Sequence, residues 1–484
     1  MVIAVEARKF DLPNLSLSSP KVTSFLYEPN SHSLALMHSD SSFSLFPSFS
    51  PFSSNSSFLP APQTLIPNPF SSACFVPLNR HSTKNQDFQD DKNVVFVVSG
   101  PYNGASRVVL RFYLLGKDGK FVTAQVGCSQ NGVRFDRKCG VIVDVSYGMK
   151  VMLCGSVNYL ALYSASGGKM WVFGVKLIGS GRDLRLVKCA VIDCTLPISS
   201  ICLSFGFLIM GELRGVRVFP LRALVKGRVG NRRRMRVAKV KGEELNVEDQ
   251  EGNVKVEGRY SKITNGVTRV SHESHEFDKN SGNVSSSKLL PDGHAYGVIG
   301  GVALRSIADG NLTPRSLKIR QDSGECGMQF VLFNDSVREE IKSRLMPSNT
   351  TKAVSIQAIS KEKFVILDSN GDLHILQVSK SGSSQMRQLT CTIQARQLAT
   401  SPDAFADSHI IWVSEGLCSV HVMVIPTSDT TEKENGESSN DGEIIHSSVT
   451  RAIFTSENIQ KMVPLAANKV LILGQDSLYA YAIS

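Results

Sequence analysis

The sequence lacks both a membrane-spanning segment and the motif of a known catalytic site. No apolar stretch reaches the roughly 18 residues that a membrane helix needs, so we expect no membrane contact. There is no G-x-x-x-x-G-K-[ST] phosphate loop, no G-x-S-x-G nucleophile elbow, no H-E-x-x-H zinc motif and no EF-hand loop. We therefore expect no enzyme activity, no cofactor and no metal site.

Two groups of polar side chains with the right chemistry for a site are better explained by local structure. His272 and His275 have an H-x-x-H spacing, but no cysteine or further histidine lies near them in a Ser- and Glu-rich stretch, so we expect no metal there. Asp368 and Asp372 lie at a hairpin turn, and Asp407 lies just before a strand. Carboxylates at such places accept hydrogen bonds from backbone N–H groups, and we interpret all three as turn residues.

The cysteines also lack a metal or redox pattern. None of the ten belongs to a C-x-x-C pair, and several lie in apolar strand-like runs, where a reduced cysteine packs as a small core residue. The first residues include Glu6 and Asp11 and resemble neither a secretory signal nor a transit peptide. We expect a reducing compartment, the nucleus or the cytosol. A plastid address in the Ser-, Phe- and Pro-rich region 39–72 is the disfavoured alternative.

Positive charge is confined to one stretch of the chain. The 484 residues include 53 basic and 43 acidic residues, a net charge of +10. Eight of the basic residues lie between Lys226 and Lys241 with no acid among them, and without these eight, 45 basic residues face 43 acidic ones. A nearly neutral body argues against a broad surface that follows a phosphate backbone, because such binding needs cations across the whole contact face.

A repeated hairpin pattern is the strongest structural signal in the sequence. About four apolar residues, a short turn rich in Gly, Asn, Asp or Ser, and an alternating apolar strand recur along the chain. Continuous apolar runs are typical of strands buried on both faces. A further strand often precedes the unit, as VTSFLYEP does at Val22. The seven copies begin at Leu34, Val94, Leu160, Phe207, Phe364, Ile410 and Val470.

This repeat resembles that of the WD40-like β-propellers, with DSNGDLHILQV at Asp368–Val378 closest to the family's inner hairpin. Five of the six spacings between copies lie between 46 and 66 residues, close to the length of a four-stranded blade with added loops. The two tryptophans, Trp171 and Trp412, belong to no W-D pair, and no G-H signature occurs. The resemblance implies an all-β protein, a single propeller of seven four-stranded blades. One or two β-sandwiches are the alternative.

The remaining spacing, 157 residues between Phe207 and Phe364, predicts an insertion. An eighth blade built from segments near Tyr296 and Met328 is an alternative reading of this region. The chain begins and ends with strand-like segments, MVIAVEARKF and LYAYAIS, so we expect residues 2–9 to pair with the blade that ends at Ile483 and to close the ring.

Three segments interrupt the predicted propeller of residues 1–484. Residues 47–72 form a Ser-, Phe- and Pro-rich loop, and residues 225–291 form a basic and then polar insertion. Residues 427–443 form an acidic loop with six acids and one base. The last two cannot bury enough apolar surface to offset the entropy of ordering, so we expect them to be disordered.

The basic stretch GNRRRMRVAKVKG begins the second of these segments. We interpret it as a nuclear localisation signal or as a contact for an acidic partner, and an import receptor is the partner that such a cluster suits. A solvated loop is the alternative. No aromatic residue alternates with the cations, so base stacking is not indicated. The candidate residues are Arg232, Arg233, Arg234, Arg236, Lys239 and Lys241. Thr313, in GNLTPRSLKIRQ, is a candidate phosphorylation site, because a phosphate would add charge beside Arg315, Lys318 and Arg320.

These features favour a non-catalytic propeller that binds protein partners through its rim and loops, within a nuclear complex. The first alternative is a chromatin- or RNA-associated subunit that holds the phosphate backbone through residues 226–241. The second is a propeller enzyme with a site in its channel. The Ser- and Phe-rich N-terminal region is plant-like in composition.

Overall fold

The computed structural model describes residues 5–12, 20–53, 57–79, 93–178, 183–226, 316–333, 351–379, 383–401, 409–425, 445–446 and 448–483. All of them belong to one compact unit formed by Met1–Gly230 and Leu312–Ser484. The remaining segment, Asn231–Asn311, lies outside the described residues.

The described strands form seven sheets, which we number in chain order. The first contains β2 (Val22–Glu28), β3 (Ser33–His38), β4 (Phe43–Phe46) and β5 (Thr64–Ile66). The second contains β6 (Ser72–Leu78), β7 (Asn93–Tyr102), β8 (Arg107–Leu115), β9 (Phe121–Thr123), β11 (Ser129–Gln130), β12 (Val133–Asp136) and β13 (Gly140–Val143). The third contains β14 (Val151–Ser156), β15 (Tyr159–Ser164), β16 (Lys169–Ile178), β17 (Asp183–Asp193), β10 (Gln125–Gly127) and β21 (Leu317–Arg320).

The other four sheets complete the described part of the chain. The fourth contains β18 (Ser200–Ser204), β19 (Phe207–Glu212), β20 (Gly215–Pro220) and β22 (Gln329–Leu332). The fifth contains β23 (Ala353–Ala358), β24 (Lys363–Asp368), β25 (Leu373–Val378), β26 (Ser384–Thr390) and β30 (Ile445–His446). The sixth contains β27 (Gln397–Thr400), β28 (His409–Ser414), β29 (Ser419–Ile425) and β31 (Ser448–Phe454). The seventh contains β32 (Lys461–Ala466), β33 (Lys469–Leu473), β34 (Ser477–Ile483) and β1 (Val5–Asp11).

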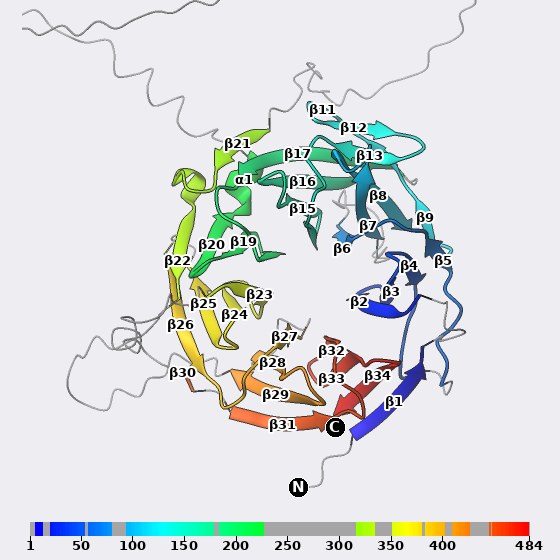
Figure 1. Ribbon diagram of the computed structural model, residues 1–484, viewed down its shortest axis with the longest axis vertical. Helices are drawn as coiled ribbons and strands as arrows, with labels where there is room; N and C mark the ends of the chain where they lie inside the picture. Colours follow the sequence, from blue (N-terminus) through cyan, green and yellow to red (C-terminus); the bar gives the residue numbers. More distant parts are fainter. Residues whose placement is uncertain are drawn as a thin grey trace, which may run out of the picture. The chain divides into compact units, whose positions relative to one another are not determined.

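The sheets are arranged radially around a ring, with β2, β23, β27 and β32 on the inside and β22, β26, β31 and β1 on the outside (Figure 1). The innermost strands of neighbouring sheets contact each other in an unbroken cycle, from β2 through β6, β14, β18, β23, β27 and β32 back to β2. The predicted all-β propeller is therefore confirmed.

The apolar core is divided among the contacts between neighbouring sheets. Within the described residues there are seven clusters of buried apolar side chains, one between each pair of adjacent sheets. In β24, Phe364 and Ile366 face the fourth sheet, whereas Val365 and Leu367 face the sixth. Successive side chains of a strand point to opposite faces, so a strand between two sheets must be apolar throughout. The continuous apolar runs of the sequence have this cause.

Each of the seven hairpins found in the sequence is the second and third strand of one sheet. The pattern at Leu34 is β3 and β4, and the pattern at Val470 is β33 and β34. The continuous apolar run lies second from the inside in every sheet. The innermost strands are the less regular segments that precede the hairpins, such as β2 and β18. MQFVLF, a candidate for an eighth blade, contains β22, the outer strand of the fourth sheet.

The expectation of four strands in every sheet is wrong for three sheets, which have six, seven and five. The additions lie at the outer edge. β21 comes from the connection between the third and fourth strands of the fourth sheet, yet it pairs in parallel with β17 of the third. β30 comes from the corresponding connection of the sixth sheet, between β29 and β31, and pairs in parallel with β26 of the fifth. Such pairing removes exposed backbone groups from a sheet edge.

The ring is closed between the two ends of the chain. β1 pairs antiparallel with β34, and the register joins Val5 to Ile483 and Asp11 to Ser477. Phe10 packs on Phe49 at a centroid distance of 5.6 Å, within the cluster between the seventh and first sheets. The first strand thus supplies the outer edge of the last sheet, which is the pairing proposed from the terminal sequences.

The structure describes the three predicted interruptions to different extents. Segment 47–72 includes β5, which pairs with β4 and completes the first sheet. The insertion between the third and fourth strands of the fourth sheet begins with α1 (Leu221–Lys226), which directly follows Pro220 and buries Leu221 and Leu224. The chain returns through β21 and a 3-10 turn, η1 (Glu325–Gly327). Residues 227–315 and 427–443 lie outside the described residues.

Candidate functional site

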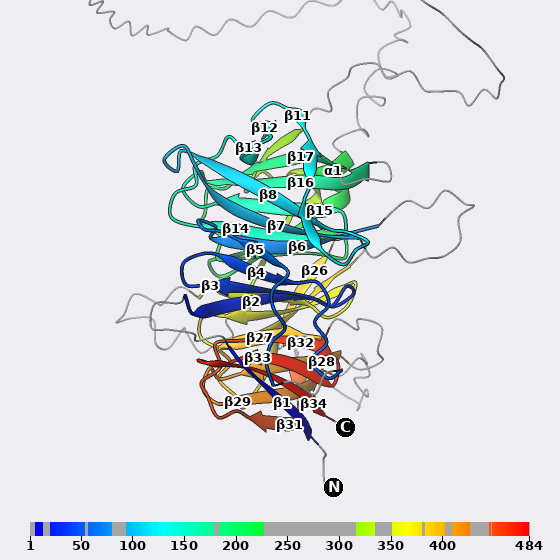
Figure 2. The same cartoon turned by 90° about the vertical axis from the view of Figure 1, so that its right-hand side faces the viewer.

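A basic pocket lies at the outer edge of the second sheet, where two partner strands of β8 diverge. β9 pairs with Tyr113–Leu115 of β8, and β13 pairs with Val108–Leu110. Arg111 and Phe112 lie between them. After Thr123 the chain leaves β8 and crosses to the third sheet, where β10 pairs with β17. Figures 1 and 2 both place β11, β12 and β13 at the outer rim of the ring.

Local sequence determines how closely the β12–β13 hairpin approaches β8. Gly140 has a φ of +112°, and a Cβ atom there would lie 2.4 Å from the backbone oxygen of Leu110, so only glycine allows this approach. The turn is held by Asp136, whose Oδ1 accepts hydrogen bonds from the backbone N–H groups of Lys138 (2.8 Å) and Cys139 (2.9 Å). These bonds lower the pKa of the Asp136 carboxyl.

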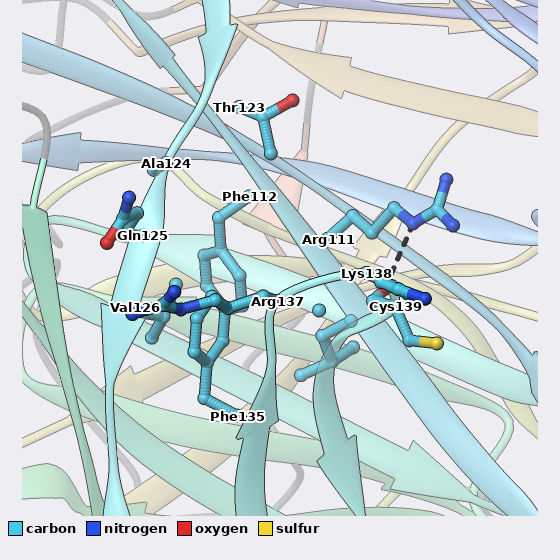
Figure 3. A pocket seen from close by; sticks show the side chains of 12 residues that line it. Arg111, Phe112, Thr123, Ala124, Gln125, Val126, Phe135, Arg137, Lys138 and Cys139 are labelled. Carbon is cyan, nitrogen blue, oxygen red and sulfur yellow. Dashed lines mark hydrogen bonds between the residues drawn. The ribbon is translucent and has the colours of Figure 1, made fainter.

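The pocket has a volume of about 290 Å³ and combines an apolar floor with a cationic rim. Its floor includes the buried side chains of Phe112, Ala124 and Val126. Figure 3 shows Arg111 and Lys138 toward the right of the view, and Gln125 and Arg137 toward the left. The twelve lining residues are Leu110, Arg111, Phe112, Thr123, Ala124, Gln125, Val126, Phe135, Arg137, Lys138, Cys139 and Gly140.

The charges of the lining residues all have one sign. Arg111, Arg137 and Lys138 are cationic, and no Asp or Glu lines the pocket. Arg111 already makes two contacts within the fold. Its Nε donates a hydrogen bond to the backbone oxygen of Cys139 (3.0 Å), and its guanidinium lies 5.3 Å from the ring centroid of Phe70. Arg137 and Lys138 are exposed and make no ion pair within the described residues.

Cys139 lines the pocket, but its environment does not activate the thiol. Burial raises its pKa, and the neighbouring Asp136 raises it further. A nucleophilic cysteine needs a lowered pKa, so Cys139 is not activated as a nucleophile. The cations that line the pocket have instead the chemistry of a binding site for an anionic group. Burial also raises the pKa of Cys154 to about 11 and that of Cys194 to about 12. All ten cysteines are free thiols.

A buried ion pair between Glu212 and Arg217 and a buried hydrogen bond between Asp368 and His374 lie elsewhere in the fold. Glu212, the last residue of β19, and Arg217 in β20 form two hydrogen bonds of 2.6 and 3.0 Å. Asp368 accepts backbone hydrogen bonds from Asn370 and Asp372, both at 2.9 Å, so its predicted role at the turn is observed. Its second oxygen lies 3.0 Å from Nε2 of His374, a partner that the local turn pattern did not indicate.

The structure does not describe most of the candidate residues that the sequence indicated. Arg232, Arg233, Arg234, Arg236, Lys239, Lys241 and Thr313, with His272, His275 and Asp407, lie outside the described residues. Among the residues that the structure describes, no three His, Cys, Asp or Glu side chains group so that they could hold a metal ion. No helix in the same part of the chain is long and apolar enough to span a membrane.

Sequence reasoning missed the pocket because its cations come from a strand, β8, and from the separate turn between β12 and β13. FDRKCG at residues 135–140 has the Asp and Gly of a tight turn, which is a local signal. Its position beside Arg111 depends on how β13 pairs with β8, about 30 residues earlier in the chain.

No family model matches the sequence, and no curated protein matches it. Similar solved structures are the C-terminal WD40 domain of Sif2 (8% identity, 97% of this chain and 83% of that one, TM-score 0.40) and the RRP9 WD40 repeats (8%, 100% and 100%, 0.44). A third is the β-propeller domain of Cps50 (Swd1) from Myceliophteria thermophila (7%, 99% and 100%, 0.43). At these identities and scores, none of them bears on what this protein binds. The ring of radial sheets, closed by its first strand, makes the chain a β-propeller in fold.

Proposed function

We propose that the protein is a non-catalytic scaffold, or adaptor, that binds other proteins through the rim of its propeller. Each of the seven sheets acts as one blade. The observation that carries the proposal is the pocket beside β8, whose apolar floor and unpaired cations are suited to binding a partner's side chains. The surrounding sheets hold these groups in fixed positions, as a binding surface requires.

The proposed location is a nuclear complex. The segment with Arg232, Arg233, Arg234, Arg236, Lys239 and Lys241 follows soon after α1, whose last residue is Lys226. We assign these cations to an import receptor or an acidic partner. Thr313 remains a proposed phosphorylation site, since it precedes β21 and its basic Lys318 and Arg320 by a few residues.

The experiment is purification of the tagged full chain from nuclear extract, followed by mass spectrometry and quantification of what co-purifies. A variant with Arg232, Arg233, Arg234 and Arg236 changed to Ala is added to the same extract, so import no longer matters. We expect the same stoichiometric proteins with both chains. Failure to recover any stoichiometric protein contradicts the scaffold proposal.

A second candidate, binding of a phosphate backbone through residues 226–241, rests on the eight cations gathered there without an acid. It predicts that RNA or DNA binds the wild-type chain, weakens steeply with salt and is lost in the four-Ala variant. Nucleic acid recovered with the wild-type chain alone favours this candidate over the scaffold.

A further inference from the structure

We propose that the pocket between β8, the β9–β10 crossing and the β12–β13 hairpin binds an acidic segment of a partner protein, with a carboxylate on its rim and an apolar side chain on its floor. This inference rests on the proposed scaffold function and specifies the chemistry of the partner. The carboxylate is assigned to Arg137 and Lys138, and the apolar side chain to Phe112 and Phe135.

The charge distribution argues for an anion. Three cations and no carboxylate line the pocket, and the nearest acid in sequence, Asp136, already accepts hydrogen bonds from two backbone N–H groups. Arg137 and Lys138 are exposed, so they keep donors available for a ligand. An arginine guanidinium presents its donors in a planar fork that matches the two oxygens of a carboxylate.

The floor argues for a protein segment. Phe112 is 2% exposed, and Phe135 is partly buried and packs against the core cluster between the second and third sheets. An apolar side chain of a ligand is stabilised when it leaves water and packs against this aromatic and aliphatic floor. A volume of about 290 Å³ is at the small end for binding pockets and suits one or two side chains.

A polynucleotide fits these observations less well. Backbone binding needs cations distributed over a long path, whereas the three here surround one small cavity. An acidic residue next to an apolar one, in an extended segment, uses both the rim and the floor. Charge complementarity therefore favours an acidic peptide as the occupant.

The test is selection from a library of random peptides of about twelve residues, displayed on phage, with the full chain immobilised. The pocket variant, Arg137→Glu/Lys138→Glu, reverses the two exposed cations. The control variant, Lys120→Glu/Arg134→Glu, makes the same change in net charge at two exposed residues that do not line the pocket, one directly before β9 and one in β12.

We expect enriched peptides with Asp or Glu beside an aromatic or aliphatic residue. Resynthesised with a fluorescent label, they should bind the pocket variant at least about tenfold more weakly and the control variant within about twofold of wild type. Replacing Glu by Gln in the peptide should cost a similar factor. Enrichment of peptides without acids, equal weakening by both variants, or no enrichment over the pocket variant would overturn the inference.

Two further measurements distinguish this inference from binding of a phosphorylated group and from docking at another surface. If inorganic phosphate at millimolar concentration displaces the peptide, or if a phosphoserine peptide binds more than about tenfold tighter than its Glu form, the ligand is a phosphorylated group and the carboxylate assignment is wrong. If stoichiometric proteins co-purify equally with wild type and pocket variant, the scaffold proposal stands and this pocket is not the docking site.

Discussion

Two outer strands of the ring, β8 and β17, each pair with two separate partner strands and keep a gap between them. On β17, β10 pairs with Asp183–Arg185 and β21 pairs with Ala190–Asp193. The side chain of Gln130 fills the gap, because its Nε2 donates to the backbone oxygen of Lys188 (3.0 Å) and its Oε1 accepts from the N–H group of Lys188. One amide side chain thus replaces a paired strand.

The gap on β8 is closed only in part. The backbone N–H of Ala124 donates to the oxygen of Phe112 (2.8 Å), and the Arg111 side chain reaches Cys139, but the space between the partner strands remains a pocket. The extra strands at the rim therefore have two different roles in this protein. Around β17 they satisfy the sheet edge, and around β8 they build a cavity with unpaired cations.

The largest effect is expected where the returning chain pairs with β20 through β22. Glu212→Ala leaves Arg217 buried without its counter-ion, although Arg217 also stacks on Phe330 (4.8 Å) and contacts Met328 (3.7 Å) in the returning segment. Removing one partner of a buried ion pair costs about 3–5 kcal/mol in the free energy of unfolding. Denaturation in urea measures it.

The matched control is Asp322→Ala in the same returning segment. Its ion pair with Arg320 is exposed, so its loss should cost less than about 0.5 kcal/mol. Equal effects of the two substitutions would show that Glu212 does not hold a desolvated charge.

The second expected effect reopens the gap on β17. Gln130→Ala leaves the N–H and oxygen of Lys188 without the amide, and we expect a loss of about 2 kcal/mol. Gln125→Ala removes an exposed amide of the same crossing and should be near neutral. Hydrogen exchange provides the readout, since the Lys188 amide should exchange faster in Gln130→Ala alone.

The two gaps also mark how far sequence reasoning reaches. All seven hairpins could be found because each strand must bury both faces, which leaves a local apolar signature such as FVIL at Phe364. β10, β21 and β30 could not be found, because short strands at an outer edge bury little and pair with a neighbouring sheet. The pocket depends on the pairing of β10 with β17 and on that of β13 with β8, so its cations carried no signal of their own.

A third prediction concerns Lys461, a partly buried cation that, unlike Arg217, makes no ion pair within the described part of the chain. Lys461 of β32 donates to Oγ of Ser24 across the ring closure (3.0 Å), and burial lowers its pKa from 10.5 to about 8. The native state thus disfavours the charged form. Below pH 8 Lys461 is protonated in both the native and the unfolded chain, so the native state bears the full free-energy cost of burying its charge. As the pH increases from about 8 to above 10, this cost falls and the free energy of unfolding rises.

Lys461→Met should therefore stabilise the protein by roughly 1–2 kcal/mol at pH 7, after loss of the Ser24 hydrogen bond is included. The advantage over wild type should shrink as the pH approaches 10. Thermal unfolding across that range, with exposed Lys176→Met as control, measures it. An advantage that does not change with pH would mean that apolar packing, and not the charge, is responsible.

The smallest expected effect bears most directly on the comparison of the two gaps. Arg137→Glu/Lys138→Glu should change the free energy of unfolding by less than about 0.5 kcal/mol, because both side chains are exposed and make no ion pair among the described residues. Arg111→Met should cost about 1 kcal/mol through the lost hydrogen bond to Cys139. Urea denaturation of the three chains distinguishes the roles. If the double variant is as unstable as Arg111→Met, the rim cations close the gap on β8 as Gln130 closes that on β17. If only Arg111→Met is affected, the fold does not need Arg137 and Lys138, and their unpaired charge is available for a ligand.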